Sequence, residues 1–395
     1  MTPPKPRAPY GSGTKPAQRA DGLWVARIEA GWTATGTRRR ITVSAKTEAE
    51  CKRRLKAKQI ELASGKAHGV NARETVKSWS ETWLPRHAKK VRPTTYTTDA
   101  GTVRKWIVPT LGHRRLADLN PGDLRKLEDT IRGAGRSSTT ALHAHTILKV
   151  MLKAAIVEGH TIAPGMLIAP KPAKARNDRG ALPIDQALAV IDVVTRRDDA
   201  PRWVASLLNG MRQGEALGLT WDRIDLDTNT LDVSWQLQWL EVGGQRPDRW
   251  EEIHLTGRAH LTRPKTSAGE RVIPIVPWMR AALEVARENW TPNPWNLVWT
   301  DDGQPIRDDE DRATWHAIQA EAGVKHPSGR PWHGHEMRHT TATLLLEAGV
   351  DRAVIEAILG QSVLVDAYLH VRQEPARKAL EAVAGRLALD TQPNP

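Results

Sequence analysis

The stretch Trp332–Thr341, WHGHEMRHTT, contains two overlapping motifs whose chemistries are incompatible. As HExxH, it places His335 and His339 one helical turn apart with Glu336 between them, which is the arrangement of a zinc peptidase. As HxxR, it offers His335 and Arg338, an imidazole and a guanidinium that together suit a phosphodiester. The rest of the chain must decide between these two interpretations.

Charge is distributed unevenly along the 395 residues. Residues 1–70 carry 15 Lys and Arg against 5 Asp and Glu, residues 71–168 carry 16 against 8, and the remainder carries 27 against 32. The excess of positive charge therefore lies entirely in the first half of the chain. Such a block predicts a polyanionic partner, because each Lys or Arg that meets a phosphate releases condensed counterions. Basic residues that serve only solubility are the alternative.

Other features of the sequence narrow the class of protein. Cys51 is the only cysteine, so we expect neither an intramolecular disulfide nor a Cys-rich zinc site. The basic, Pro-rich start is not followed by the apolar segment of a signal peptide, and the chain has no long uninterrupted apolar run. We expect a cytoplasmic protein that does not span a membrane.

Hydrophobic periodicity and turn signals predict a multidomain α+β protein. Residues 1–70 alternate apolar and polar side chains and then turn helical, which predicts a small β-sheet with one helix. Residues 71–168 contain amphipathic segments with helix start and stop signals, which predict an all-helical part. Residues 169–180 are Pro-rich, charged and aperiodic, as is typical of a linker. Residues 181–388 combine helices with apolar runs that predict strands, and residues 389–395 form a tail.

Four segments within residues 181–388 contain, one after another, side chains that are suited to catalysis. They are LLNGMRQGEALGLTWDRIDLD, RPKTSAGERVIPI, HEMRHTTATLLLEAGVDRAVIEAILGQS and AYLHV. Their chemically relevant residues are, in chain order, Arg212, Glu215, Lys265, His335, Arg338 and Tyr368. An ordered set of four segments is far more specific than a lone pentapeptide.

These segments resemble the first arginine box, the β-hairpin lysine segment, the second box and the nucleophile segment of the tyrosine recombinases, the phage integrase family. The resemblance extends over residues 181 to about 385, and the front parts match the family's modules more loosely. It implies an arm-type DNA-binding domain in residues 1–70 and a SAM-like core-binding domain in residues 71–168. For residues 181–388 it implies a mainly helical catalytic domain with a small β-sheet, the DNA breaking-rejoining fold. The ordered boxes favour HxxR over the zinc motif.

Tyr368 occupies the nucleophile position of the resemblance. Cutting DNA without water or metal needs a nucleophile that stores the phosphodiester energy, and a tyrosine does so as a phosphotyrosyl ester. Because the free pKa of tyrosine is about 10, ionising it at pH 7 costs roughly 4 kcal/mol, which nearby cations or a proton acceptor must offset. The resemblance implies no cofactor and no metal.

The other site residues have chemistry that suits this reaction. Arg212 and Arg338 carry planar guanidinium forks that bind non-bridging phosphate oxygens bidentately. His335 is expected to assist proton transfer or to orient the phosphate. The family assigns its lysine, carried on a mobile hairpin, to protonation of the departing 5′ oxygen, which implies this role for Lys265. Glu215 is expected to be a buried structural partner rather than an acid or base.

The last segment departs from the family pattern in two ways. Gln361 stands where the family generally has His, less often Trp; it can hydrogen-bond a phosphate but cannot carry a proton at pH 7. Gln361 and Tyr368 are seven residues apart, whereas the family usually has about two or three more. A helix advances about 1.5 Å and 100° per residue, so the difference could move the hydroxyl by several ångströms. Tyr368 would then act through a rearranged loop, act in a neighbouring protomer's site, or be out of reach.

We therefore predict a site-specific DNA recombinase that integrates or excises a mobile element. The expected partners are double-stranded DNA attachment sites, three further copies in a homo-tetramer on DNA, and accessory directionality or DNA-bending proteins. Candidate DNA-contacting residues are Arg38, Arg39, Arg40, Lys89, Lys90 and Arg92. The helix predicted in RQEPARKALEAVAGRLAL either docks on a neighbouring copy or closes its own domain.

Three alternatives remain. The most serious is a DNA-binding family member that has lost cleavage because of the short Tyr368 segment. A zinc metallopeptidase is disfavoured because Leu345 occupies the third-ligand position and Arg338 would put a like charge beside the metal. A metal-dependent nuclease built on TDDGQPIRDDEDR, residues Thr300–Arg312, is disfavoured because clustered acids there are typical of a solvated loop and helix start.

Overall fold

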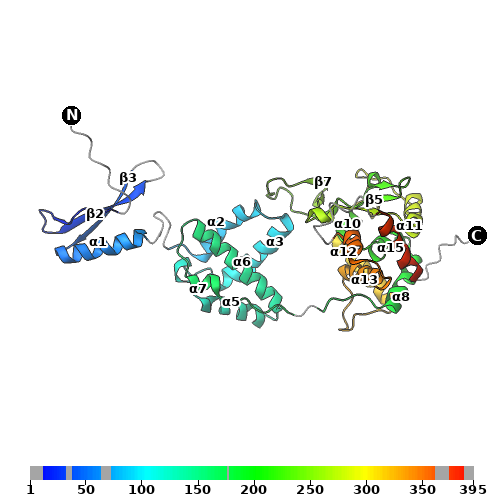
Figure 1. The fold of residues 1–395 in the computed structure, drawn as a ribbon, viewed down its shortest axis with the longest axis horizontal. Helices are drawn as coiled ribbons and strands as arrows, with labels where there is room; N and C mark the ends of the chain where they lie inside the picture. The colour runs from blue at the N-terminus through cyan, green and yellow to red at the C-terminus, as the bar shows by residue number, and fades with distance from the viewer. Residues whose placement is uncertain (1–11, 33–37, 64–72, 176–177, 361–372, 387–395) are drawn as a thin grey trace, which may run out of the picture. The chain divides into compact units, whose positions relative to one another are not determined.

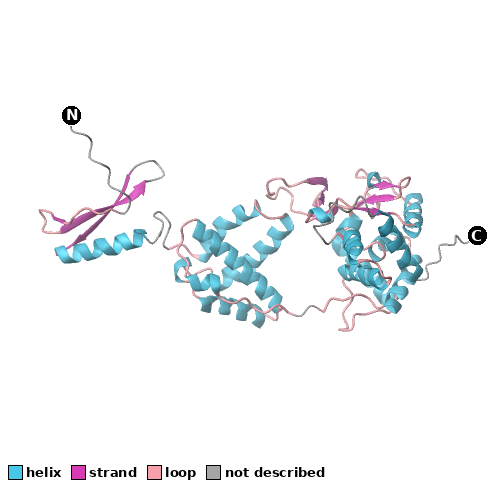
Figure 2. Cartoon of the chain, in the orientation of Figure 1, coloured by secondary structure: helices cyan, strands magenta, loops and turns pink. Residues whose placement is uncertain are grey.

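The computed structural model describes residues 12–32, 38–63, 73–175, 178–360 and 373–386. Contacts divide the chain into two compact units, residues 1–176 with 245–247 and residues 177–244 with 248–395. The predicted α+β fold class is confirmed: helices dominate, and small antiparallel sheets occur in both units (Figure 2).

The first part of the chain is a small sheet covered by one helix, as predicted. Strands β1 (Ala17–Gln18), β2 (Trp24–Trp32) and β3 (Arg38–Ala45) pair antiparallel in that order, and helix α1 (Glu48–Ala63) follows. Helix α1 packs on the sheet formed by β2 and β3 (Figure 1). Ala26, Ala45 and the free Cys51 are buried between them. Because few side chains are buried here, this part has a small core of its own.

The second part is a helical bundle, again as predicted. Its helices are α2 (Val76–Ala88), α3 (Pro93–Thr102), the π-helical turn η1 (Val103–Ile107), α4 (Val108–Leu111), the 3-10 turn η2 (Leu116–Asp118), α5 (Pro121–Gly133), α6 (Ser138–Val157) and α7 (Pro164–Ile168). The Asn-Pro start signal is confirmed, because Asn120 caps α5 and Pro121 begins it. The Asp123 carboxylate accepts a hydrogen bond from the Asn120 N–H at 3.0 Å, which completes a capping box.

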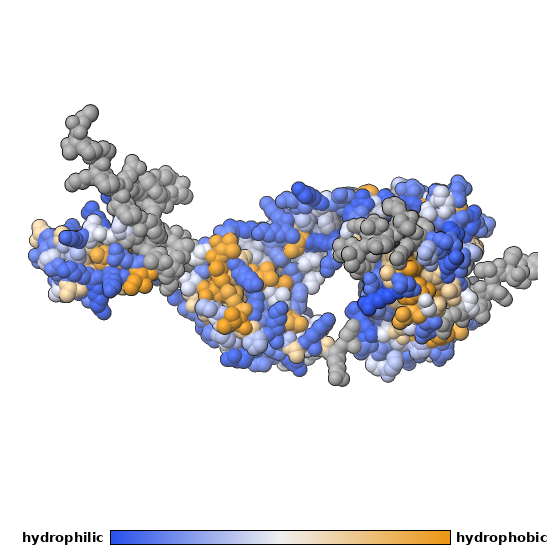
Figure 3. Space-filling model, in the orientation of Figure 1, coloured by the Kyte–Doolittle hydropathy of each residue, from blue (hydrophilic) through white to orange (hydrophobic). Residues whose placement is uncertain are grey.

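Helix α6 is the central helix of the bundle. Its apolar positions, among them Ile147, Leu148 and Met151, are buried in the helical core. Of the helices that the structure describes, α6 alone has the length and hydropathy of a membrane span, and half of that window is buried inside the protein. Apolar side chains also reach the surface of this part (Figure 3), including Val157 at the end of α6 and Ile168 at the end of α7.

The second unit is mainly helical and carries two three-stranded sheets. Its helices are α8 (Ile184–Thr195), α9 (Ala200–Leu207), α10 (Gln213–Leu217), α11 (Pro277–Glu288), α12 (Asp308–Glu321), α13 (Gly334–Glu347), α14 (Arg352–Leu359) and α15 (Gln373–Arg386), with 3-10 turns η3 (Trp221–Arg223) and η4 (Ser267–Gly269). One sheet has the order β4 (Ile224–Asp225), β5 (Thr230–Asp232), β9 (Val272–Pro274), and the other β6 (Gln236–Trp239), β8 (Ala259–Thr262), β7 (Glu252–Thr256). All the pairings are antiparallel.

The C-terminal helix α15 closes its own unit. Ala376, Ala379, Leu380 and Val383 are buried in the main core, and α15 packs against α13, α14 and β9. Of the two expectations for this amphipathic segment, the structure therefore favours closure of the unit that contains it. Leu387, which the sequence pattern would add to the same face, lies outside the described residues.

Candidate active site

Arg212 stands directly before helix α10, where the chain is turned by Gly210 in the left-handed region at φ +62°. The Glu215 carboxylate caps the helix by accepting the Arg212 N–H at 2.9 Å, and it also accepts a hydrogen bond from Nη1 of the same arginine. Nη2 of Arg212 donates to the carbonyl of Gly360 at 3.3 Å. Arg212 is thus held at its backbone N–H and at both terminal nitrogens, while 36% of its side chain stays exposed.

Arg271, which the sequence analysis did not single out, holds three parts of the site together. Its guanidinium donates to both Glu215 oxygens, at 3.2 and 2.9 Å, and to the carbonyls of Gly269 at 3.1 Å and Ile358 at 2.7 Å. Burial alone would raise the pKa of Glu215, but the charges of Arg271 and Arg212 lower it to about 2. Glu215 is therefore a buried structural anion, as expected. Arg271 lies one residue before β9, in the same alternation phase as the buried Ile273, but a single arginine at a strand start is usually solvated and so did not stand out.

Arg338 lies on helix α13 and is buried, with 2% of its surface exposed. Nη1 donates to the Gly210 carbonyl at 2.6 Å, whereas Nε and Nη2 have no hydrogen-bond partner among the described residues. Burial, followed by the charges of Arg271 and Arg212, lowers the pKa of Arg338 to about 8. A buried cation without a counter-ion is costly unless an anion completes it, so this position favours a bound phosphate.

His335 occupies the first turn of the same helix, and its side chain is only partly exposed to solvent. Desolvation comes first among the causes that lower its pKa to about 4, and the charges of His339, Arg338, Arg179 and Arg212 add to it. The ring is consequently neutral at pH 7 and able to accept a proton. That Arg338 and Arg212 both act on this ring indicates that the structure brings the three predicted residues together in one cationic site.

Glu336 answers the question raised by the HExxH motif. It is fully buried and accepts hydrogen bonds from Arg330 Nη1 at 2.8 Å and Nη2 at 2.9 Å, from the His333 N–H at 2.7 Å and from the Gly180 N–H at 3.1 Å. A metallopeptidase needs this glutamate free to activate a metal-bound water. Since four donors already occupy its carboxylate, the zinc interpretation of the motif loses its general base.

Lys265 lies on the loop between β8 and η4, and its side chain is exposed. The strands on either side of this loop, β8 and β9, belong to different sheets. The expectation of a lysine carried on a two-stranded hairpin is therefore wrong. The physical reason is that the β8 strand pairs with β6 and β7, while β9 pairs with β5, so the chain leaves one sheet for the other at this loop.

Gln361 and Tyr368 lie outside the described residues. The last described residue before them, Gly360, ends helix α14 in the left-handed region at φ +57°. A Cβ at this position would lie 2.4 Å from the carbonyl oxygen of Ala268, so glycine is needed there. Because Arg212 binds the Gly360 carbonyl, the chain is fixed beside Arg212 where the nucleophile segment begins.

The candidate DNA-contacting residues fall in the first unit. Arg38, Arg39 and Arg40 begin strand β3, and the exposed Arg40 forms an ion pair with Glu29 across the sheet at 2.9 Å. Lys89 and Lys90 are exposed after helix α2. Arg92 is half-buried and precedes helix α3. These positions stay predictions, placed on a sheet and on a turn between two helices.

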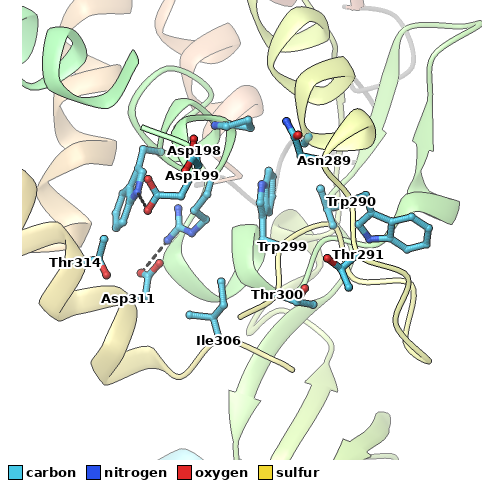
Figure 4. A pocket seen from close by; sticks show the side chains of 15 residues that line it. Asp198, Asp199, Asn289, Trp290, Thr291, Trp299, Thr300, Ile306, Asp311 and Thr314 are labelled. Carbon is cyan, nitrogen blue, oxygen red and sulfur yellow. Dashed lines mark hydrogen bonds and ion pairs between the residues drawn. The ribbon is translucent and has the colours of Figure 1, made fainter. Parts of the chain in front are cut away.

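The acidic stretch before α12 is only partly solvated. Asp308 and Asp309 are exposed and pair with neighbouring arginines, as expected for a helix start. Asp311, in contrast, is buried: its Oδ2 accepts from Arg202 at 2.9 Å and from Gln213 at 2.8 Å. The carboxylate borders a cavity of about 280 Å³ that is also lined by tryptophans (Figure 4). The expectation of a solvated loop is wrong for this residue, because Arg202 needs a buried counter-ion.

Comparison with known proteins identifies relatives of both units. The pattern of the phage integrase family matches residues 204–374, and that of the phage integrase N-terminal SAM-like domain matches residues 75–130. The Integrase of Saccharopolyspora erythraea is 26% identical over 415 aligned residues, which cover 89% of this chain and 91% of the relative. The Tyrosine recombinase XerC-like protein of Caldanaerobacter subterraneus subsp. tengcongensis is 23% identical, with 84% and 89% covered.

Solved structures with a similar fold come from the same group of proteins. The Tn1549 transposon integrase in complex with a circular intermediate DNA superposes with a TM-score of 0.63 at 20% identity, covering 78% of this chain and 99% of that one. A lambda integrase tetramer bound to a Holliday junction gives 0.55 at 16% identity, with 92% and 95% covered.

The family match and the similarity to a tyrosine recombinase define a class of enzyme, the tyrosine-type DNA strand transferases. Within that class, the chain belongs to the phage integrase family, the tyrosine recombinases.

Proposed function

We propose that this protein is a site-specific recombinase that cleaves and rejoins DNA through a 3′-phosphotyrosyl intermediate, and so integrates or excises a mobile element. The observation that carries the proposal is the incomplete hydrogen bonding of Arg338, whose Nε and Nη2 have no partner among the described residues. Two parallel N–H donors on a planar guanidinium match two oxygens of a phosphodiester. A scissile phosphate seated there would also meet Arg212 and His335, which act on the same electrostatic site.

The proposed reaction uses six side chains. The Tyr368 oxygen attacks phosphorus, the bond to the 5′ oxygen breaks, and a phosphotyrosyl ester forms on the 3′ end. The tyrosine proton passes to the neutral His335 ring, and Lys265 gives a proton to the leaving 5′ oxygen. Arg212 and Arg338 stabilise the charge that develops on the non-bridging oxygens. Attack by a 5′-hydroxyl on the ester reverses these steps and reseals the strand. Gln361 would position the phosphate by hydrogen bonding.

The proposed partners follow from the charge distribution and from the relatives. Residues 1–70 would bind outlying arm-type sites, and residues 71–168 would clamp the core site together with the catalytic domain, residues 181–388, on the other side of the linker 169–180. Four copies would exchange strands on double-stranded attachment sites in the cytoplasm, with accessory proteins setting direction. The lambda integrase that resembles this chain is described as a tetramer on a Holliday junction.

A second candidate function is DNA binding without cleavage. The short spacing of seven residues between Gln361 and Tyr368 favours it, because a hydroxyl displaced by several ångströms cannot attack in line. This candidate keeps the cationic site for phosphate binding but predicts no covalent product.

The test is covalent trapping. The protein, its Tyr368→Phe variant and a matched Tyr96→Phe variant are incubated with a nicked suicide substrate that carries the attachment site. We expect an adduct that survives denaturation with the parent and with Tyr96→Phe, and none with Tyr368→Phe. Binding by all three proteins without any adduct would replace the proposal with the DNA-binding alternative.

A further inference from the structure

The acidic residue inside the HExxH sequence has no role in the reaction proposed above, yet its carboxylate is buried and accepts four hydrogen bonds. Glu336 lies one residue after His335 and two before Arg338, on the first turn of α13. Burial would raise the pKa of its carboxyl, but the hydrogen bonds from Arg330, His333 and Gly180 lower it to about 2. The group is therefore an anion at all working pH values, and each partner holds it in that form.

Two of these partners connect Glu336 to the chain that enters the second unit. Gly180 donates its N–H to Glu336 directly at 3.1 Å. Arg330 binds Glu336 with both terminal nitrogens, and its Nε donates to the Asp178 carboxylate at 3.1 Å. His326 adds a hydrogen bond between its Nε2 and the Asp178 carbonyl at 2.8 Å. The end of the predicted linker is thus tied to Glu336 directly through Gly180 and indirectly through Arg330, and His326 ties it to the loop before α13.

The same contacts determine where the first turn of α13 lies. Glu336 caps the helix through the His333 N–H, and the Leu182 N–H donates to Thr340 Oγ1 at 2.9 Å one turn further on. Arg338 has an additional anchor on the Gly210 carbonyl, whereas His335 is partly exposed and depends on this turn. A loosened turn would therefore displace His335 more than Arg338.

The linker also brings charge to the site. Arg179, between Asp178 and Gly180, is exposed and is one of the cations that lower the pKa of His335. The other groups that act on the ring are His339 and Arg338 on α13 and Arg212 before α10. Release of the linker end would remove the Arg179 contribution and part of the desolvation, and both changes raise the pKa of His335.

We propose that Glu336 is a positioning residue that latches the linker end, Asp178–Gly180, onto the first turn of α13, and thereby fixes His335 for the cleavage step. The proposal rests on the proposed function for the role of His335 in the reaction. Its consequence is that the linker between the predicted core-binding and catalytic domains controls the geometry and protonation of a reacting group through a buried carboxylate.

The first test measures the latch without DNA. The ring resonances of His335 are titrated by NMR in the parent, in Glu336→Gln and in Asp178→Asn, which removes only the exposed arm of the latch. Glu310→Gln is the matched control, because Glu310 caps α12 as Glu336 caps α13 and accepts the Arg307 N–H at 3.3 Å. We expect the midpoint of His335 to rise toward about 6.5 in Glu336→Gln, to rise less in Asp178→Asn, and to stay unchanged in Glu310→Gln.

The direction in which the titration midpoint of His335 moves distinguishes release of the linker from the mere loss of a nearby negative charge. Loss of a nearby negative charge on its own would lower the midpoint of His335, whereas release of the linker raises it. A lowered or unchanged midpoint in both latch variants would overturn the proposal. Should Glu336→Gln fail to fold, Asp178→Asn decides alone, since its side chain is 59% exposed and its loss leaves the core intact.

The second test uses single-turnover cleavage of the suicide substrate over a range of pH. Misplacement of His335 should slow adduct formation by on the order of 10- to 100-fold in Glu336→Gln and move the acid limb of the rate to higher pH. Equal DNA affinity of the variants would show that binding is intact. An absent adduct in the parent contradicts the proposed function, whereas an unchanged rate and acid limb in Glu336→Gln beside an active parent contradicts only the latch.

Discussion

Two arginines in the second unit are buried to the same extent but differ in how their charge is compensated. Arg202 and Arg338 are both 2% exposed. Arg202 has a counter-ion, Asp311 at 2.9 Å, a hydrogen bond to Ser206 Oγ at 2.6 Å and the face of Trp203 at 4.8 Å, and of its nitrogens Nε alone has no hydrogen-bond partner among the described residues. Arg338 has one carbonyl, that of Gly210, and two nitrogens without a partner among the described residues.

The difference shows how a structural cation can be told from a functional one. A buried charge that serves the fold is matched by a buried partner, because an isolated ion in the interior costs several kcal/mol. A buried charge that serves a reaction is held in place but left short of partners, so that the substrate completes it. By this criterion we assign Arg202 to the core and predict that Arg338 serves the reaction.

The largest expected effect comes from removing the functional arginine. Arg338→Met should slow adduct formation by at least about 10³-fold, because the phosphate loses a fork of two donors in the transition state. The free energy of unfolding should stay equal or rise, since an uncompensated buried charge is replaced by an apolar side chain. Arg338→Lys keeps the charge without the fork and should also be slow. Loss of folding in Arg338→Met would place Arg338 with the core residues instead.

The structural arginine should behave in the opposite way. Arg202→Met leaves Asp311 buried without its cation and should lower the free energy of unfolding by about 3 to 5 kcal/mol. The double variant Arg202→Met, Asp311→Leu removes both charges and should recover most of this loss. Urea unfolding followed by circular dichroism measures both values. If Arg202→Met were as stable as the parent, Arg202 would not be a structural cation, and its contrast with Arg338 would be wrong.

A smaller effect concerns the pH dependence of stability at Glu215. Its folded pKa of about 2 lies below the ordinary 4.5, so its contribution is present above pH 4.5 and is lost as the pH falls toward 2. For a buried carboxylate this shift corresponds to at most about 3 kcal/mol. Glu215→Gln should therefore be less stable at pH 6 and show a flatter loss of stability between pH 4.5 and 2. If the free energy of unfolding of the parent and of Glu215→Gln fell in parallel between pH 4.5 and 2, Glu215 would not be a buried anion with a lowered pKa.

The smallest effect is expected in the pH dependence of cleavage. With a pKa of about 4, His335 stays neutral and able to accept a proton well below pH 6. The single-turnover rate should change less than about twofold between pH 7 and 5.5 on account of this group. A histidine with the ordinary pKa of about 6.5 would instead lose most of its neutral form over that range. A steep fall in rate across the same interval would indicate that the partial burial and the cationic neighbours that lower the pKa of His335 are absent in solution.

The sequence predicted the parts of the site that depend on order along the chain. Arg212, His335 and Arg338 lie in sequence motifs whose spacing and residue types are specific to the family. In the structure these three side chains lie close enough to interact electrostatically. Glu215 was expected to be buried and structural, which is confirmed. The small sheet with one helix and the helical bundle that follows it were predicted from periodicity, because buried side chains recur every second residue in strands and every three to four residues in helices.

The parts that could not be predicted depend on contacts between distant segments. Nothing in GERVIPI distinguishes an inward Arg271 from a solvated one, because its partner Glu215 is 56 residues away. Glu336 likewise looks like half of a zinc motif until Gly180 is seen against it, 156 residues apart in the chain. The loop of Lys265 was wrongly expected to be the turn of a hairpin, because the strands on either side of it belong to different sheets. The alternation of apolar and polar residues within a strand does not indicate which strand it pairs with.

Cleavage by Tyr368 is tested most directly by identifying the residue that carries the DNA. The adduct trapped on the suicide substrate is digested with protease and nuclease, and the peptide that retains a nucleotide is sequenced by mass spectrometry. We predict a single modified peptide that contains Tyr368, with its phosphate on the phenolic oxygen. Modification of Tyr96 or Tyr10, or a DNA-bound protein without any modified peptide, would contradict it.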